Sequence, residues 1–195
     1  MSTAGTAKGL TPPQLTPGAR RILETAAELF YSHGIHAVGV DTIAEESGLT
    51  KRTLYDRFGS KDALVAAYLQ VRHEAWWARL EKRLAALSAE STPGSRALAV
   101  FDSYTLDSET TARGCAFVNA AAELPSDHPA RGVVRAHKRA VEGLLADILG
   151  DSPDPRSLAE HVFLLLEAGI VHRGIDGDDR RLVRARRLVE DLVTP

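Results

Sequence analysis

The sequence predicts an all-α protein of nine helices, divided into two helical units. Apolar residues make up 44% of the 195 residues, and along most of the chain they recur at intervals of three and four, the spacing of one helical face. The helix-favouring residues Leu, Ala, Glu and Arg are abundant. Several apolar stripes begin at a Thr-Pro or Asp-Pro pair, where proline takes the first helical position after a capping residue. We expect a disordered tail over residues 1–15, a three-helix unit over 16–62 and a larger helical unit over 63–195.

The first helix is expected from Pro17 to about His33, with Thr16 as its cap and Gly34 ending it. Its apolar face consists of Ile22, Ala26, Leu29 and Phe30. Before it, residues 1–15 hold Ser, Thr, Gly, Pro and Lys without periodicity, which is typical of a disordered tail.

Two short helices follow between Val40 and Lys61, with Gly48 between them. Val40, Ile43 and Ala44 form the apolar face of the first. Glycine permits the chain reversal after it. Thr50 is placed to cap the second helix, in which Leu54 and Phe58 share one face. This is the pattern of a helix-turn-helix, whose second helix is the candidate reader of the DNA major groove.

The polar side chains of the second short helix lie off its apolar face. From Thr50 to Lys61 there are four basic residues and one acid, a net charge of +3 in a chain whose net charge is −2. Such a surface offers cations and hydroxyls to phosphates and donors to guanine edges. Ser60 is placed to cap the next helix, where Lys61 opposes the helix dipole unless a phosphate is near.

The run T-K-x-T-L-Y-x-x-F-x-S-K from Thr50 to Lys61, following Ala44 and Gly48, resembles the TetR family of bacterial one-component repressors. The tract from about Arg20 to Leu64 covers the DNA-binding domain of that family. The resemblance implies a nine-helix TetR-like architecture and DNA contacts for Thr50, Lys51, Arg52, Thr53, Tyr55, Arg57 and Lys61. The chain departs from the family at Gly39, where Ser or Thr usually caps the first helix of the motif and touches a phosphate.

A long helix is expected from Lys61 to about Leu87, roughly 40 Å at 1.5 Å per residue. The next runs from Thr92-Pro93 to a polar loop over 107–113. A short helical segment, CAFVNAAAEL, lies between Gly114 and Pro125. Three more helices are expected: one from about residue 128 to Leu149, one after Asp154-Pro155, and one over about 178–192. The arginines of the last helix form a stripe that we interpret as a solvated face.

The resemblance also implies a small-molecule pocket among the middle helices. Its candidate residues are Trp76, Phe101, Tyr104, Phe117, Asn119, Glu123, His137 and Phe163. A mostly apolar lining fits an apolar, weakly polar or cationic effector. For several of these residues a structural role stays open: Glu123 could accept bonds from a neighbouring helix, and His137 could be a hydrogen-bonded core histidine.

The last two helices carry wide apolar stripes, which a twin copy would bury as a four-helix bundle. The candidate interface residues are Val162, Leu165, Leu166, Gly169, Leu182, Ala185 and Val189. TetR-like proteins dimerise through these two helices. A dimer would read two half-sites roughly 34 Å apart in a palindromic operator.

We therefore expect a ligand-responsive regulator that binds double-stranded DNA, most simply a repressor released by a small-molecule effector. The alternative is a helical small-molecule-binding protein without specific DNA recognition. We expect no enzyme, cofactor or metal site: Cys115 has no histidine near it in sequence, and no glycine-rich phosphate loop occurs. No run approaches ~18 apolar residues and the first fifteen residues lack a signal-peptide core, so a cytoplasmic location without membrane contact is expected.

Overall fold

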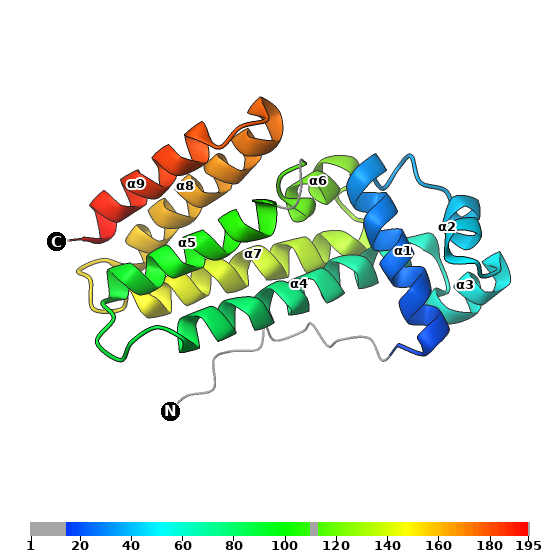
Figure 1. Ribbon diagram of the computed structural model, residues 1–195, viewed down its shortest axis with the longest axis horizontal. Helices are drawn as coiled ribbons and strands as arrows, with labels where there is room; N and C mark the ends of the chain where they lie inside the picture. The colour runs from blue at the N-terminus through cyan, green and yellow to red at the C-terminus, as the bar shows by residue number, and fades with distance from the viewer. Residues whose placement is uncertain (1–14, 110–112, 195) are drawn as a thin grey trace. The chain divides into compact units, whose positions relative to one another are not determined.

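The computed structural model describes residues 15–109 and 113–194 (Figure 1). Over those residues the secondary structure consists of nine α-helices and no strand, as the sequence predicted. The predicted tail lies outside the described residues except for Leu15. None of the described helices is long and apolar enough to cross a membrane.

The helices form two compact units, and each unit combines two segments that are separated in the sequence. The first contains residues up to Glu74 together with Ala116–His137, and the second contains Ala75–Cys115 and the residues from Lys138 onward. The boundary predicted at residues 62–63 falls inside the first unit. The predicted two-domain division stays a prediction.

The first unit is built on three short helices that pack against one another. These are α1 (Pro17–His33), α2 (Val40–Ser47) and α3 (Lys51–Phe58). The unit also includes α6 (Ala116–Glu123) and the first parts of α4 (Lys61–Ala85) and α7 (Pro129–Ile148). Its fully buried side chains include Ile22, Ala26, Ile43, Leu54, Leu64 and Leu69. Ile22, Ala26, Ile43 and Leu54 lie on the faces that the apolar spacing of the sequence indicated.

Capping side chains fix where the helices begin. Thr16 Oγ1 accepts from the N–H of Ala19 at 3.4 Å, and Ser60 Oγ accepts from Ala63 at 3.0 Å. Thr92 and Asp154 cap α5 and α8 by accepting from residues three positions on, both at 3.1 Å. The helix starts expected from Thr-Pro and Asp-Pro pairs are confirmed, because a capping oxygen satisfies an N–H that the helix itself leaves unpaired.

The second unit has a core of apolar side chains from five helices. They are α5 (Pro93–Glu109), α8 (Pro155–Asp176), α9 (Arg180–Val193) and the later parts of α4 and α7. The large residues buried in this core include Trp76, Leu80, Phe101, Val141, Leu145, Leu166, Ile170 and Leu182. The helices α8 and α9 lie side by side and antiparallel (Figure 1), and α5 packs against both.

Close approach of α8 and α9 depends on Gly169. A Cβ added there would lie 2.9 Å from Leu182 Cδ1 and 3.3 Å from the Cβ of Ala185. The guanidinium of Arg186 on α9 also binds Asp102 on α5 through two hydrogen bonds of 2.6 and 3.1 Å.

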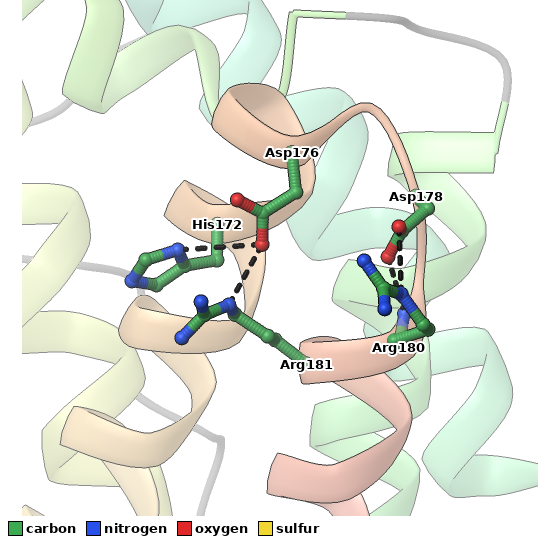
Figure 2. Close-up of polar contacts among 5 residues, drawn as sticks. All are labelled: His172, Asp176, Asp178, Arg180 and Arg181. Carbon is green, nitrogen blue, oxygen red and sulfur yellow. Dashed lines mark hydrogen bonds and ion pairs between the residues drawn. The ribbon is translucent and has the colours of Figure 1, made fainter.

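A polar network holds the turn between α8 and α9 (Figure 2). Asp178 accepts from the backbone N–H of Arg180 at 3.0 Å and from its Nε at 2.8 Å, and these bonds lower the pKa of Asp178. Asp176 accepts from Nε of Arg181 at 2.7 Å, and Nδ1 of His172 lies 3.5 Å from the same oxygen. Arg180 and Arg181 belong to the arginine stripe that we interpreted as a solvated face. Each is paired with an aspartate at this turn.

Two predicted boundaries were wrong by a few residues. Helix α4 ends at Ala85 rather than near Leu87, and beyond it the N–H of Leu87 bonds three residues back, to Leu84 O, at 3.3 Å. Helix α5 continues to Glu109, through the start of the polar loop predicted over 107–113. Residues 110–112 of that loop lie outside the described residues.

Most residues predicted for the dimer interface are buried within one chain, and their contact with a twin copy stays a prediction. Val162, Leu166, Gly169, Leu182, Ala185 and Val189 are buried, and Leu165 packs against the same core. The apolar stripes of α8 and α9 face each other and α5, so these side chains are not exposed to a partner. A second apolar stripe of α8, over Leu164, Ala168, Val171 and Ile175, is exposed or half-buried.

Candidate nucleic-acid interface

The helix-turn-helix is formed by α2 and α3, joined through a left-handed glycine. Gly48 has φ 65° and ends α2, and the next N–H, of Leu49, bonds back to Ala44 O at 3.0 Å. Thr50 then caps α3 by accepting from the N–H of Thr53 at 3.1 Å. Leu54 is fully buried and anchors α3 to the unit. Gly39 precedes α2 without any side-chain cap bond, as expected from its lack of a side chain.

The face of α3 opposite Leu54 carries the predicted DNA-contacting groups. Thr50, Lys51, Arg52, Tyr55 and Arg57 are exposed, and Thr53 is half-buried with its hydroxyl 2.9 Å from that of Thr50. Tyr55 is a large aromatic residue left 45% exposed. Cations, hydroxyls and a phenol on one short helix can bind phosphate oxygens and base edges.

Acidic side chains accompany two of the exposed cations. Lys51 Nζ lies 2.7 Å from Asp41 Oδ1, which joins the starts of α3 and α2. The hydrogen bond and charge of Asp41 raise the pKa of the Lys51 ammonium. Arg52 Nε lies 3.8 Å from Asp56 one turn further along α3. Asp41 was missed by the sequence reasoning, although its place in the first turn of α2 after an uncapped Gly39 is a signal that could have found it.

Lys61 occupies a different environment from the other predicted DNA contacts. Its Nζ donates to the carbonyl oxygen of Ile35 at 2.7 Å and lies 5.9 Å from the centroid of the Phe30 ring. Burial lowers the pKa of this ammonium. Lys61 is therefore tied to the turn between α1 and α2, a role that the sequence pattern did not indicate.

Glu123 on α6 holds the other side of that turn. Its Oε2 accepts from the backbone N–H of His36 at 2.8 Å, and a Cβ added at Gly34 would meet both carboxylate oxygens at 3.1 Å. Beside Glu123 is a small cavity of about 10 Å³, lined by Phe30, Tyr31, Ile35, Tyr68, Ala116, Asn119, Ala120 and Glu123. That volume suits about one water molecule.

The geometry agrees with the comparison to known proteins. Residues 22–68 match the family model described as bacterial regulatory proteins, tetR family. The fold matches SCO4454, a TetR-family transcriptional regulator from Streptomyces coelicolor, with 29% identity and a TM-score of 0.81, over 91% of this chain and 89% of that chain. The helix-turn-helix part of this chain is that of the TetR family of bacterial transcriptional regulators, and the described fold is TetR-like.

Two further relatives differ in how much of their length matches this chain. The HTH-type transcriptional activator FasR of Mycolicibacterium smegmatis is 45% identical over 53 residues, which span 27% of this chain and 24% of FasR. This chain thus matches about a quarter of that relative. Reduced NemR of E. coli has a TM-score of 0.79 at 23% identity, over 92% of this chain and 98% of NemR, and shows the fold alone. The family is one of regulators rather than enzymes.

The residues predicted to line the TetR-type effector pocket divide between the two units. In the second unit Trp76 and Tyr104 have ring centroids 4.8 Å apart, Phe101 is buried beside them, and Phe163 packs against the same core. In the first unit the Phe117 ring stacks on His137 at 3.8 Å, and Nδ1 of His137 lies 2.9 Å from Nδ1 of His73. Asn119 and Glu123 line the small cavity. Their contact with an effector stays a prediction.

One polar cluster of the second unit was not found from the sequence. Lys138 on α7 donates to the Glu167 carboxylate on α8, and its Nζ lies 3.5 Å from the Cys115 sulfur and 5.4 Å from the Tyr104 ring centroid. Both charged groups are mostly buried. The pair becomes recognisable only when α7 and α8 are packed together, since the two residues are far apart in sequence.

Proposed function

We propose that this chain is a ligand-responsive transcriptional repressor that binds a palindromic operator as a homodimer and is released by a small molecule. The observation that supports it most is the exposed face of α3, where cations, hydroxyls and Tyr55 surround a helix anchored by the buried Leu54. A helix of this kind in a helix-turn-helix enters the major groove. DNA as the partner favours a cytoplasmic location.

The DNA contacts we propose are Thr50, Lys51, Arg52, Thr53, Tyr55 and Arg57. Lys61 is proposed chiefly as a support for the turn before α2, because its ammonium already donates to Ile35. A single short helix reaches few base pairs, so a dimer with two-fold symmetry and half-sites roughly 34 Å apart is proposed to supply the rest.

For the dimer we propose the outward stripe of α8 in place of the buried residues first expected. Leu164, Ala168, Val171 and Ile175 recur at steps of four, three and four, which is one face of a helix about 16 Å long. Leu164 is 56% exposed and Ile175 69%. Leu188 and Leu192, one turn apart on α9, are 41% and 45% exposed. Apolar surface of this kind is stabilised when a second copy covers it.

The effector is proposed to act by selecting a state in which the two reading helices no longer match the operator spacing. A coupling of ~1–3 kcal/mol would weaken DNA binding about 5- to 150-fold. Within the first unit, Glu123 supplies a physical route, because a shift of α6 would move the carboxylate that holds the turn leading into α2. The chemical identity of the effector is open among apolar, weakly polar and cationic molecules.

Activation is the second candidate outcome, because the relative FasR is named as an activator. That match is confined to 53 residues, so it supports DNA reading and does not favour either outcome for this chain. A promoter–reporter assay with the selected operator distinguishes them: repression lowers the reporter signal when the protein is expressed, and activation raises it.

The proposed DNA binding is tested by selecting duplexes from a random-sequence pool with the purified protein. Fluorescence anisotropy then compares the selected duplex with a shuffled duplex at fixed salt. We expect preference for the selected duplex, and a loss of about 5- to 150-fold for Arg57→Ala if it contacts a guanine. Arg187→Ala, an equally exposed arginine on α9, should bind like wild type. Equal weak binding to both duplexes would favour a small-molecule-binding protein without specific DNA recognition.

A further inference from the structure

The ammonium of Lys51 is restrained on the surface where free movement would be expected. It lies 2.7 Å from Asp41 Oδ1, although the side chains of the lysine and the aspartate are 53% and 76% exposed. A surface pair of this kind contributes little to stability. A lysine is otherwise a point charge on a flexible four-carbon stem that can follow any nearby phosphate. The pair therefore changes what Lys51 can bind more than it changes the fold.

The pair leaves Lys51 able to bind DNA, but with a bias in the kind of acceptor. An ammonium has three donors, so one can stay with Asp41 while the others reach the O6 and N7 acceptors of a guanine. Those atoms are uncharged and tolerate a neighbouring carboxylate. A phosphate is anionic, and approaching Lys51 would bring it close to Asp41, where like charges repel.

A purely structural role for Asp41 would have different consequences. Asp41 lies in the first turn of α2, where Gly39 provides no side-chain cap, and Lys51 begins α3, where a cation opposes the dipole. Support of these two helix starts would alter the stability of the motif. It would affect all DNA sequences alike, and would not alter the base preferred at any position.

We propose that Asp41 is a specificity-determining residue, which directs the Lys51 ammonium to an uncharged base-edge acceptor such as guanine and away from the phosphate backbone. This inference rests on the proposed function as a DNA reader. On this proposal, Asp41 makes the affinity of the wild-type chain for random DNA weaker than the basic residues of α3 alone would give.

The test compares Asp41→Asn with a matched variant, Glu46→Gln, which removes the same charge from an exposed position on the same helix. Binding of each variant and of wild type to the selected and shuffled duplexes is measured at 50 and 200 mM salt, and urea unfolding verifies the fold. For Asp41→Asn we expect tighter binding to shuffled DNA and a salt slope steeper by about 0.9 per protomer, which is about 3.5-fold between the two salt concentrations. The ratio of selected to shuffled affinity should fall about 5-fold or more.

A second readout is the sequence preference itself. Repeating the duplex selection with Asp41→Asn should relax a guanine preference at one position of each half-site, whereas Glu46→Gln should select the wild-type sequence. If both variants strengthen binding to both duplexes equally and keep the same preference, the inference is overturned and Asp41 contributes only bulk charge. If wild type itself does not discriminate between the duplexes, the proposed function fails and this inference fails with it.

Discussion

The Glu123 carboxylate on α6 accepts a hydrogen bond from the backbone N–H of His36, 87 positions away in the sequence, at 2.8 Å. One residue earlier, the carbonyl of Ile35 accepts from Nζ of Lys61 at 2.7 Å. A carboxylate and an ammonium from two other helices thus hold the N–H and the C=O of one peptide group, that between Ile35 and His36, in the turn that leads into α2. Because both bonds go to the backbone, they fix the course of the chain as it enters the helix-turn-helix.

Replacing Glu123 should loosen this turn. In Glu123→Ala the His36 N–H loses its acceptor, so we expect faster amide hydrogen exchange at His36 and a loss of about 1 kcal/mol in the free energy of unfolding. Glu123→Gln keeps an acceptor oxygen and should lose less. The exposed Glu24 on α1 provides the control, since Glu24→Ala should leave exchange at His36 unchanged. Wild-type exchange in Glu123→Ala would mean that the turn is held without the carboxylate.

Lys61→Ala separates a structural role from a phosphate contact. We expect the free energy of unfolding to fall by about 1 kcal/mol, and the urea midpoint to fall with it, because the Ile35 carbonyl loses its donor. The salt slope of DNA binding should change less than the ~0.9 expected for a lost phosphate contact. Arg57→Ala, at an exposed residue of α3, should keep the wild-type urea midpoint. Unchanged stability with a reduced slope would restore the phosphate contact implied by the family resemblance.

The helices could be predicted from sequence because their signals are local. Thr16, Thr50 and Ser60 each cap the helix that immediately follows, and the spacing that buries Leu54 is contained in one turn of α3. The exposed face of α3 follows from the same spacing. The sequence motif from Thr50 to Lys61, which includes this face, then indicated a resemblance to the TetR family.

The backbone groups that Lys61 and Glu123 bind could not be predicted, because each lies far from its partner in the sequence. The sequence pattern gives a charge and a helical face, but not the backbone group that comes to lie beside it. The same limit applies to the residues predicted for the dimer interface. An apolar stripe such as Leu182, Ala185 and Val189 must be covered, and nothing in its spacing tells whether α8 of the same chain or of a twin covers it.

The outward stripe of α8 should control association of two chains. We expect Leu164→Glu combined with Ile175→Glu to convert a dimer into single chains, because two carboxylates buried within an apolar contact would lose their hydration. Light scattering coupled to size-exclusion chromatography measures the mass directly. Leu106→Glu, at a residue of α5 that is 42% exposed, should keep the wild-type mass. If the α8 double variant stays dimeric, the interface lies elsewhere.

The stability of the first unit should fall in mild acid because of the histidine pair between α4 and α7. The His73 ring is buried, with its Nδ1 2.9 Å from that of His137, and burial lowers the pKa of His73 below its ordinary value of 6.5. As the pH falls below about 6.5, the unfolded chain therefore binds a proton at this position before the folded chain does. The free energy of unfolding then decreases with falling pH, by up to about 1.4 kcal/mol per pH unit for one group, until the pH reaches the pKa in the folded chain.

Urea unfolding at pH 7.5, 6.5 and 5.5 measures this dependence, with His73→Asn as the test variant. Carboxylates titrate in wild type and variant alike, so the difference between their slopes isolates the buried imidazole. His73→Asn should lose less stability than wild type between pH 6.5 and 5.5, whereas His33→Asn, at an exposed position at the end of α1, should follow wild type. If the stability of wild type and of His73→Asn falls equally between pH 6.5 and 5.5, His73 binds a proton as readily in the folded chain as in the unfolded chain.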